Sequence, residues 1–319
     1  MIYLNRLRKA LRVYRATYRN WLSVLLNLVL RGRARAAIRG GNVVEGDEVL
    51  LGYIARLHTH WLHCCRLIDV SNDLSYAVFE IGGRRVTLYG WRHIPFKDLD
   101  SYSGLLDVKG KSVLDVGAYV GDSAILFALM GARKVVAVEP SPWAYSVAKR
   151  NVEANGLGSV ITLVNCAVSR EDGKTLVLPS REIDPGFSAL AAAEGDVPVP
   201  TCTLDSLIEK YGPFDVVKVD CEGCEHESIP YSRRVGEVKE ILVEYHGGYE
   251  DVERKLRDEG FKNINILKLP IFCARVQTSY LVIRLIHCRA IFMRQSKLSC
   301  QASDDNKLII NNKIYKSKS

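Results

Sequence analysis

The sequence lacks an apolar run long enough to cross a bilayer as a helix, which takes about 20 residues. The longest run, "NWLSVLLNLVL" (20–30), ends at Arg31, and "YLVIRLIHCRAIFM" (280–293) is interrupted by Arg284 and Arg289. A basic start is a feature of signal peptides, but "RGRARAAIRG" (31–40) is a poor cleavage region. No internal repeat is found in the sequence. These features predict no membrane-spanning helix.

Acidic residues are missing from residues 1–40, which hold ten Lys and Arg residues. They are scarce again in 287–319, where seven basic residues accompany two acidic ones. Because the whole chain has a net charge of +8, residues 41–286 must be net negative. A folded domain that tracks nucleic acid would carry the basic residues itself, so nucleic acid is not the expected partner. Basic ends instead suit an anionic partner such as a membrane surface.

The cysteines number nine, and their scattered spacing gives no disulfide framework. We therefore expect a reducing, cytoplasmic location, with the intracellular disulfides of hyperthermophiles as the known exception. Two groups could be considered as zinc sites: Cys221 and Cys224 with His226 and His246, and the cluster of His60, His63 and Cys64. No second C-x-x-C pair completes a four-ligand zinc site, so we expect packing roles and no metal.

An apolar stripe with helical spacing runs along residues 3–30. Its members are Leu4, Leu7, Leu11, Tyr14, Tyr18, Trp21, Leu25 and Leu28, and the bases off the stripe are Arg6, Arg8, Lys9, Arg12, Arg15 and Arg19. Such a helix can make peripheral contact with a membrane, pack on a partner, or dock on the protein's own body, and the pattern leaves these alternatives open. "GRARAAIRGGN" (32–42) then predicts a flexible linker, which ends a first segment at about residue 40.

The rest of the chain divides into three further segments. Residues 41–106 predict a helix in "EVLLGYIARLHTHWLHCCRLI" and a β-hairpin in "YAVFEIGGRRVTLYGW", with its turn at Gly82-Gly83. Residues 107–286 alternate strands and helices, which predicts an α/β fold with a mostly parallel sheet and helices on both faces. The expected strands are 113–117, 134–139, 160–165, 215–220 and 240–245, and the expected helices are 122–130, 142–154, 203–211 and 249–259. Residues 287–319 predict a basic, mostly disordered tail.

The stretch "VLDVGAYVGDSAILFALMG" (113–131) places two glycines where a strand turns into a helix. Gly117 allows a sharp turn and close approach of a ligand, and Gly121 lets the helix begin tight against the sheet. In a dinucleotide fingerprint a glycine would stand at Tyr119, and Asp115 has the wrong charge for a phosphate. Asp115 suits a cation, such as the amino group of a methionine moiety.

Polar side chains also follow the next strands of the expected sheet. Glu139 ends the second strand, where a carboxylate can accept both hydroxyls of a ribose. Asn165 and Ala167 follow the third strand, beside the place for an adenine edge, and Asp220 follows the fourth. Together these positions indicate a cofactor that contains adenosine but no pyrophosphate, and S-adenosylmethionine fits best.

At about 100–285 the sequence resembles the FkbM-type methyltransferases, a branch of the class I S-adenosylmethionine-dependent enzymes. The resemblance rests on "LDVGAYVGD" (114–122), "VVAVEPSP" (135–142), "NCAVS" (165–169), "TLDSL" (203–207), "VKVDCEGCE" (217–225) and "VEYHG" (243–247). It implies a seven-stranded Rossmann-like sheet whose last strand is antiparallel, and O-methylation of hydroxyls on sugars or small metabolites. The expected cofactor-binding residues are Asp115, Gly117, Tyr119, Gly121, Asp122, Glu139, Pro140, Asn165, Ala167 and Asp220. The chain departs from the family at Tyr119, where asparagine is usual, and at Cys221 and Cys224, where small apolar residues are usual.

Glu222 and His246 are the expected catalytic residues, because an alcohol acceptor needs a base to take its proton. Each follows a strand, so both can point into one mouth of the sheet. The alternatives are structural: Glu222 capping backbone amides in its turn, and His246 in a strand-end hydrogen bond. Lys218 is expected to lie deeper and pair with an acid. A divalent ion on Asp220, Glu222 and Glu244 is conceivable, but we expect none.

Three other functions are alternatives to methyl transfer to a small molecule or glycan. An RNA methyltransferase would use the basic ends, but the sequence after the fourth strand is "DCEG" and not an aromatic N/D-P-P-[YF] motif. A non-catalytic module would follow if Tyr119 filled the methionine pocket. A nicotinamide oxidoreductase is disfavoured by the missing third glycine. Acceptor specificity is expected to lie in 40–106 and in the loop 180–200, which could act as a lid.

Overall fold

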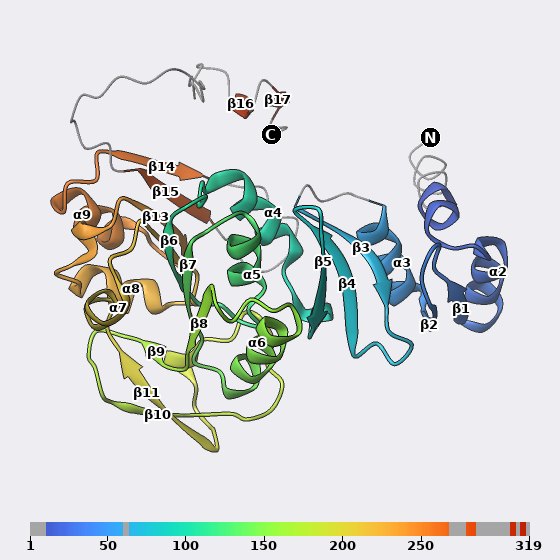
Figure 1. The fold of residues 1–319 in the computed structure, drawn as a ribbon, viewed down its shortest axis with the longest axis horizontal. Coiled ribbons are helices and arrows are strands. Elements are labelled where there is room, and N and C mark those ends of the chain that lie inside the picture. Colours follow the sequence, from blue (N-terminus) through green and yellow to red (C-terminus); the bar gives the residue numbers. More distant parts are fainter. Residues whose placement is uncertain (1–10, 60–63, 268–278, 285–306, 311–312, 317–319) are drawn as a thin grey trace. The chain divides into compact units, whose positions relative to one another are not determined.

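The computed structural model describes residues 11–59, 64–267, 279–284, 307–310 and 313–316 (Figure 1). The chain divides into two units, Met1–Ile286 and His287–Ser319. The site lies in the first of them. Between residues 107 and 260, the helices and strands of the first unit lie close to the bounds expected from the sequence. Before residue 107 the observed and expected bounds agree less well.

A parallel sheet forms the centre of the first unit. Its strands are β6 (Ser112–Val116), β7 (Lys134–Val138), β8 (Ile161–Val164), β12 (Val216–Val219) and β13 (Glu240–Tyr245), in the order β13-β12-β6-β7-β8. All four neighbouring pairs are parallel. Beyond β13 the sheet continues with β15 (Ser279–Arg284) and β14 (Asn263–Leu267), each antiparallel to its neighbour. The five parallel strands confirm the expected α/β class.

Helices cover both faces of this sheet, as expected (Figure 1). They are α4 (Phe96–Leu105), α5 (Asp122–Leu129), α6 (Pro142–Ala154), α7 (Leu204–Tyr211), α8 (Cys224–Ser228) and α9 (Glu250–Asp258), with the 3-10 turns η1 (Trp91–His93), η2 (Ala189–Ala191), η3 (Ile229–Tyr231) and η4 (Val235–Glu237). Alternate strand residues serve the two faces, because side chains alternate along a strand. Val113 and Val135 belong to the core under α5, whereas Leu114 and Val136 belong to the core under α7 and α9.

An antiparallel sheet precedes the parallel one in the chain. It consists of β3 (Cys65–Val70), β4 (Tyr76–Ile81) and β5 (Arg84–Tyr89), and the turn at Gly82-Gly83 confirms the expected hairpin. Side-chain amides of α6 join the two regions: Asn151 and Asn155 each bond the backbone of β5 on both its donor and acceptor sides. The helix expected over 48–68 is too long, since α3 covers Glu48–His58 and β3 begins at Cys65.

The continuous helix expected over 3–30 is wrong in its described part. Residues 11–17 are helical, the chain then turns, and α2 covers Trp21–Arg31. The break occurs because Tyr18 is buried, pairs with Ile38 as a β-bridge and donates its hydroxyl to the Leu51 carbonyl at 2.7 Å. The flexible linker is also wrong: this segment forms β1 (Arg33–Ala37), which pairs with β2 (Val43–Asp47).

Two disulfides correct the expectation that the cysteines are unpaired. Cys166 bonds Cys202, at the ends of β8 and β11, and Cys221 bonds Cys224 in the loop after β12. The strands around the first bond are β9 (Ala167–Val168), β10 (Thr175–Leu178) and β11 (Val197–Cys202). The sequence spacing of 36 residues carried no sign of this pairing, because β9 and β11 become neighbours through the fold.

Of the second unit, the structure describes β16 (Lys307–Ile310) and β17 (Lys313–Lys316), which pair antiparallel. The expected disorder is therefore wrong for these two strands, and the rest of the tail lies outside the described residues. His60 and His63, considered as metal ligands, also lie outside them. Within the described part of the chain, no helix has the length and apolar character needed to cross a membrane.

Candidate active site

A cavity of about 110 Å³ opens at the carboxyl edge of β6, β7 and β12. It is lined by Pro95, Asp98, Tyr102, Gly117, Tyr119, Asp122, Ser123, Glu139, Pro140, Ile183, Pro185, Phe187, Ala189, Lys218, Asp220, Cys221, Glu222 and Glu244. A smaller, more apolar cavity of about 20 Å³ shares Gly117, Pro140, Ala189 and Cys221 with it and reaches Ala167. Ligands of open α/β sheets bind at this edge.

The glycines of the β6–α5 turn behave as the sequence predicts. Gly117 has φ +78°, and a Cβ there would lie 1.7 Å from the Asp220 carbonyl oxygen. Gly121 has φ +80°, and a Cβ there would lie 3.2 Å from the Ala148 Cβ. Both positions combine left-handed backbone with close neighbours, so a side chain would be costly at either. Gly117 therefore brings bare backbone of β6 against the loop after β12.

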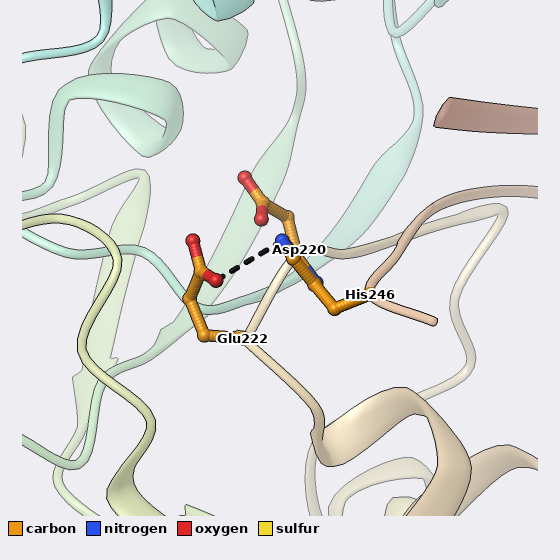
Figure 2. Close-up of side chains that lie close together, drawn as sticks. All are labelled: Asp220, Glu222 and His246. Atoms are coloured by element: carbon orange, nitrogen blue, oxygen red, sulfur yellow. Dashed lines mark ion pairs between the residues drawn. The ribbon is translucent and has the colours of Figure 1, made fainter. Parts of the chain in front are cut away.

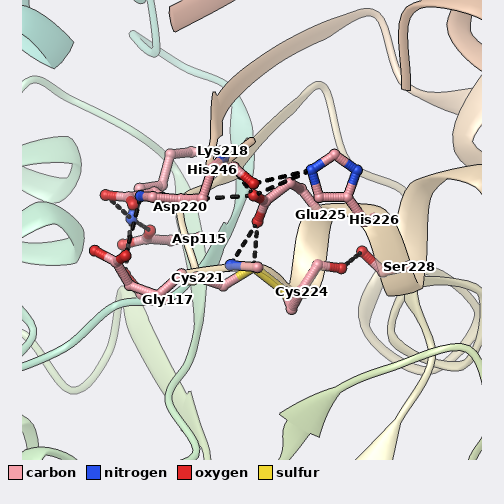
Figure 3. The surroundings of a disulfide bond; sticks show 12 residues. Asp115, Gly117, Lys218, Asp220, Cys221, Cys224, Glu225, His226, Ser228 and His246 are labelled. Atoms are coloured by element: carbon pink, nitrogen blue, oxygen red, sulfur yellow. Dashed lines mark hydrogen bonds and ion pairs between the residues drawn. A yellow bond between two sulfur atoms is a disulfide. The ribbon is translucent and has the colours of Figure 1, made fainter. Parts of the chain in front are cut away.

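A buried ion-pair network joins those two strands (Figure 3). The Lys218 ammonium lies 3.1 Å from Asp115 and 3.7 Å from Asp220, and it donates to the Gly117 carbonyl at 2.7 Å. Burial alone would lower the pKa of Lys218, but the charges of Asp115 and Asp220 outweigh it and raise the pKa. The pairing expected of Lys218 is thus present. Asp115 is fully buried, also accepts from Ser123 at 2.6 Å, and does not line the cavity.

Glu139 lies at the cavity wall with two fixed backbone contacts. It accepts the amide N–H groups of Tyr119 and Ser141, both at 2.8 Å. Burial raises the pKa of Glu139 to about 7, and burial also raises the pKa of Asp122 to about 7 at the start of α5. Tyr119 has φ +46°, lines the cavity, and donates its hydroxyl to the Ile183 carbonyl at 2.9 Å. Its ring is therefore tied to the loop that covers the cavity.

Ala167 lines a cavity, whereas Asn165 does not. The Asn165 amide donates to the carbonyls of Glu139 and Pro140 at 2.8 and 3.0 Å, so it holds the loop after β7. It lines neither cavity. Ala167 and Pro140 line the smaller one. The structure thus brings most of the expected cofactor residues to the two cavities, while Asp115, Gly121 and Asn165 line neither of them.

The two expected catalytic residues lie together, as Figure 2 shows. The His246 Nε2 is 3.1 Å from the Glu222 carboxylate, yet it has no aligned hydrogen bond with any group of the described residues. Burial raises the pKa of Glu222 against the opposing charge of His246. Burial alone would lower the pKa of His246, but Glu225 and Glu222 outweigh it and raise the pKa. Glu222 has φ +54°, a left-handed conformation that costs about 1–3 kcal/mol and is common at functional sites.

Glu225 holds this pair in place (Figure 3). Its fully buried carboxylate accepts the His246 amide at 2.7 Å and the Gly223 amide at 3.0 Å, and it lies 3.3 Å from the His246 Nδ1. The Cys221–Cys224 disulfide spans the same turn, and the Cys221 sulfur lies 3.5 Å from the Glu225 carboxylate. Glu225 therefore connects the strained Glu222 turn to the end of β13.

Sequence reasoning missed the roles of Glu225 and Tyr102. Glu225 was part of the motif "VKVDCEGCE", but its spacing from Glu222 gave no sign that it would reach the end of β13. The Tyr102 hydroxyl donates to Asp220 at 2.5 Å from α4, across 118 residues of sequence. No local signal could have found that contact, because it depends on how α4 packs beside the sheet.

Three side chains could each offer one metal ligand: Asp220, Glu222 and His246, whose ligand atoms lie within 4.8 Å of one another. Cys221 and Cys224 are bonded to each other, so they do not form the zinc site considered from the sequence. Tyr102 and Lys218 already engage Asp220, and a divalent ion would compete with the Lys218 ammonium. The three residues are therefore better suited to proton transfer than to binding a metal ion.

The loop 180–196 forms one wall of the cavity through Ile183, Pro185 and Phe187. Besides the Tyr119 contact, Glu182 pairs with His93, and Ser180 bonds Asp196 at 2.6 Å. Pro95, Asp98 and Tyr102 form another wall. The regions expected to determine the acceptor thus border the cavity.

Residues 115–263 match the family model of the methyltransferase FkbM domain. Among curated proteins, a protein assigned as a protein N5-glutamine methyltransferase of Methanocaldococcus jannaschii is 35% identical over 81 residues, 25% of this chain and 41% of that protein. The ribosomal protein L11 methyltransferase of Actinobacillus pleuropneumoniae is 27% identical over 118 residues, 34% of this chain and 40% of that protein. This chain thus spans about two fifths of these relatives.

Solved structures with a similar arrangement include the precorrin-6y C5,15-methyltransferase of Geobacter metallireducens, with a TM-score of 0.40 and 12% identity, covering 61% of this chain and 90% of that one. Another is TYW2 of M. jannaschii in complex with AdoMet, with a TM-score of 0.38 and 13% identity, covering 66% of this chain and 87% of that one.

Proposed function

Because residues 115–263 of this chain match the family model of the methyltransferase FkbM domain, we propose that the protein transfers a methyl group from S-adenosylmethionine to a hydroxyl of a sugar, glycan or other metabolite. The observation that carries the proposal is the contact of Glu222 with His246, held by Glu225, at the wall of the cavity. A carboxylate with a raised pKa is suited to take a hydroxyl proton.

The cavity residues fit this cofactor. S-adenosylmethionine supplies a methyl group on a positively charged sulfonium centre. The cavity wall carries the carboxyl groups of Asp122, Glu139 and Asp220, so its charge complements a cation. Glu139 would bind the ribose hydroxyls, and Pro140 and Ala167 would lie beside the adenine. Gly117 would offer its bare backbone, since a Cβ has no room there.

The chain's own residues would perform the proton transfer and the alignment. An alcohol oxygen is a weak nucleophile until its proton leaves, and Glu222 would take that proton. S-adenosylmethionine would supply the methyl group and leave as S-adenosylhomocysteine, while Glu222 would hold the proton that the acceptor hydroxyl releases. His246 would act as a positioning residue, with Glu225 fixing its Nδ1. The walls formed by α4 and the loop 180–196 would align the acceptor and exclude water.

Binding of the cofactor is the first test. Titration calorimetry with S-adenosylmethionine and S-adenosylhomocysteine should show binding of both to the wild type and strongly weakened binding to Glu139→Ala. Arg84→Ala, on exposed β5, is the matched control and should bind as the wild type does. If the wild type binds neither ligand, Tyr119 closes the site and the protein is a non-catalytic module.

The catalytic role is tested with tritiated methyl groups on S-adenosylmethionine and a panel of monosaccharides, glycans, proteins and RNA. Glu222→Gln should lower kcat by about 10²–10⁴-fold while cofactor affinity stays unchanged. His246→Gln removes the charge that lowers the pKa of Glu222, so the acid limb of the pH–rate profile should move to higher pH. Label in protein or RNA, or an unmoved acid limb in His246→Gln, would contradict the proposed acceptor or the proposed roles.

A further inference from the structure

The outer face of α2 exposes four large aliphatic side chains. Leu22, Leu26, Val29 and Leu30 are 65%, 59%, 84% and 69% exposed. Their spacing of four, three and one residues places them on one side of a helix. None of them belongs to the stripe expected from the sequence.

The stripe expected from the sequence faces inward over its described residues 14–28. Tyr14 and Tyr18 are buried in the core, and Trp21, Leu25 and Leu28 pack against it beside the fully buried Val24. α2 packs on β1 (Figure 1), and the Asn20 side chain ties its start to the backbone of Arg35 and Ala37 at 2.9 and 2.8 Å. The helix that carries the exposed aliphatic face is therefore held in place by the folded domain.

The charge of the segment that carries this face is mainly positive, although Glu45 and Asp47 of β2 lie opposite Arg35 and Arg33 of β1. The first acidic residue of the chain is Glu45, and the described arginines before it are all exposed: Arg12, Arg15, Arg19, Arg31, Arg33, Arg35 and Arg39. Residues 41–286 are net negative, so the net positive charge of the first unit comes from residues 1–40. An aliphatic face among arginines complements a surface that is apolar within and anionic at its headgroups.

We propose that the α2 face formed by Leu22, Leu26, Val29 and Leu30 docks on an anionic lipid membrane, with exposed arginines of the same segment at the headgroups. The four side chains enter the boundary between headgroups and acyl chains while α2 lies parallel to the surface. A nucleic-acid surface is the weaker match, because base stacking uses exposed aromatic side chains and the described ones of this segment, Tyr14, Tyr18 and Trp21, are turned inward. The inference does not depend on the proposed methyl transfer.

The full chain is tested by sedimentation with large vesicles of phosphatidylcholine alone or of equal parts phosphatidylcholine and phosphatidylglycerol. We expect binding to the anionic vesicles, weak binding to the neutral ones, and weakening at high salt. Val29→Asp should weaken binding at least about tenfold, because it puts a charge into the apolar boundary. Val49→Asp is the matched control, since Val49 is 76% exposed on α3, and it should bind as the wild type does.

Circular dichroism melting identifies a variant that fails to fold, and Leu26→Ser then replaces it as the milder change. Absence of binding to anionic vesicles, or equal binding by wild type and Val29→Asp, overturns the proposal. So does a change of oligomeric state in Val29→Asp on gel filtration with light scattering, because the face would then be an interface between copies of this chain.

Discussion

The region around α2 and the cavity at the end of the parallel sheet use charge in opposite ways. Around α2 the charges are mainly arginines exposed to water, with Glu45 and Asp47 of β2 opposite Arg35 and Arg33. At the cavity they are mainly carboxyl groups, and Asp115, Asp122 and Glu139 are buried. Water screens the charges of the first group, so each arginine interacts weakly with other charges and only their total charge has a large effect. Burial magnifies each charge in the second group, which is why the pKa values of Asp122 and Glu139 are raised.

The largest expected effect is at Lys218. Lys218→Met leaves Asp115 buried without its cation and the Gly117 carbonyl without its donor. We expect the free energy of unfolding to fall by about 3–5 kcal/mol, measured by urea denaturation. The double variant Asp115→Asn with Lys218→Met should recover part of this loss. An effect of Lys218→Met below about 1 kcal/mol would show that the buried pair contributes no more than a surface pair.

An intermediate effect is expected from pH at Glu139. The ionised carboxylate accepts ribose hydroxyls, so affinity for S-adenosylmethionine should rise by about tenfold from pH 6 to pH 8 if the pKa is about 7. Stability of the free protein runs the other way: burial raises this pKa, so stability is lost as pH rises through about 7. Calorimetry across this range measures the first effect. Glu139→Gln should reduce the change of cofactor affinity with pH, and Asp122→Asn should reduce any change that remains. If the pH dependence of affinity is unchanged in both variants, these two carboxyl groups are not its cause.

The smallest effect is expected at the surface of β1. Arg33→Ala and Arg35→Ala remove exposed charges, so each should change the free energy of unfolding by less than about 0.5 kcal/mol. Thermal melting in one buffer compares them with Lys218→Met. A loss of more than about 1 kcal/mol at either arginine would mean that these side chains stabilise the fold directly, and the contrast between the two regions would fail.

The degree to which the sequence predicted the molecule also differs between these regions. The central strands and helices lie within a residue or two of their expected bounds, and Ser141 caps α6 with Pro142 following it. The first forty residues were predicted less well. A helical stripe says that one face is apolar, but it does not say that Tyr18 will pair with Ile38 and end the helix.

The residues of the candidate site also fall into those that the sequence predicted and those that it did not. Gly117, Glu139, Asp220 and Glu222 could be placed from the sequence because each stands where a strand of a parallel sheet ends, and all such ends share one edge. Glu225 and Tyr102 could not be assigned roles, since their partners lie on β13 and beyond β12. The Cys166–Cys202 bond likewise depends on β9 and β11 becoming neighbours.

The sequence by itself determined the α/β class, the glycine turn after β6, and the carboxylates at the sheet edge. Those features follow from periodicity and backbone sterics, which act over a few residues. The tertiary structure alone decided which side of α2 faces water, which acid holds His246, and which cysteines bond. Those features depend on contacts between distant segments, and a chain acquires such contacts when its elements pack.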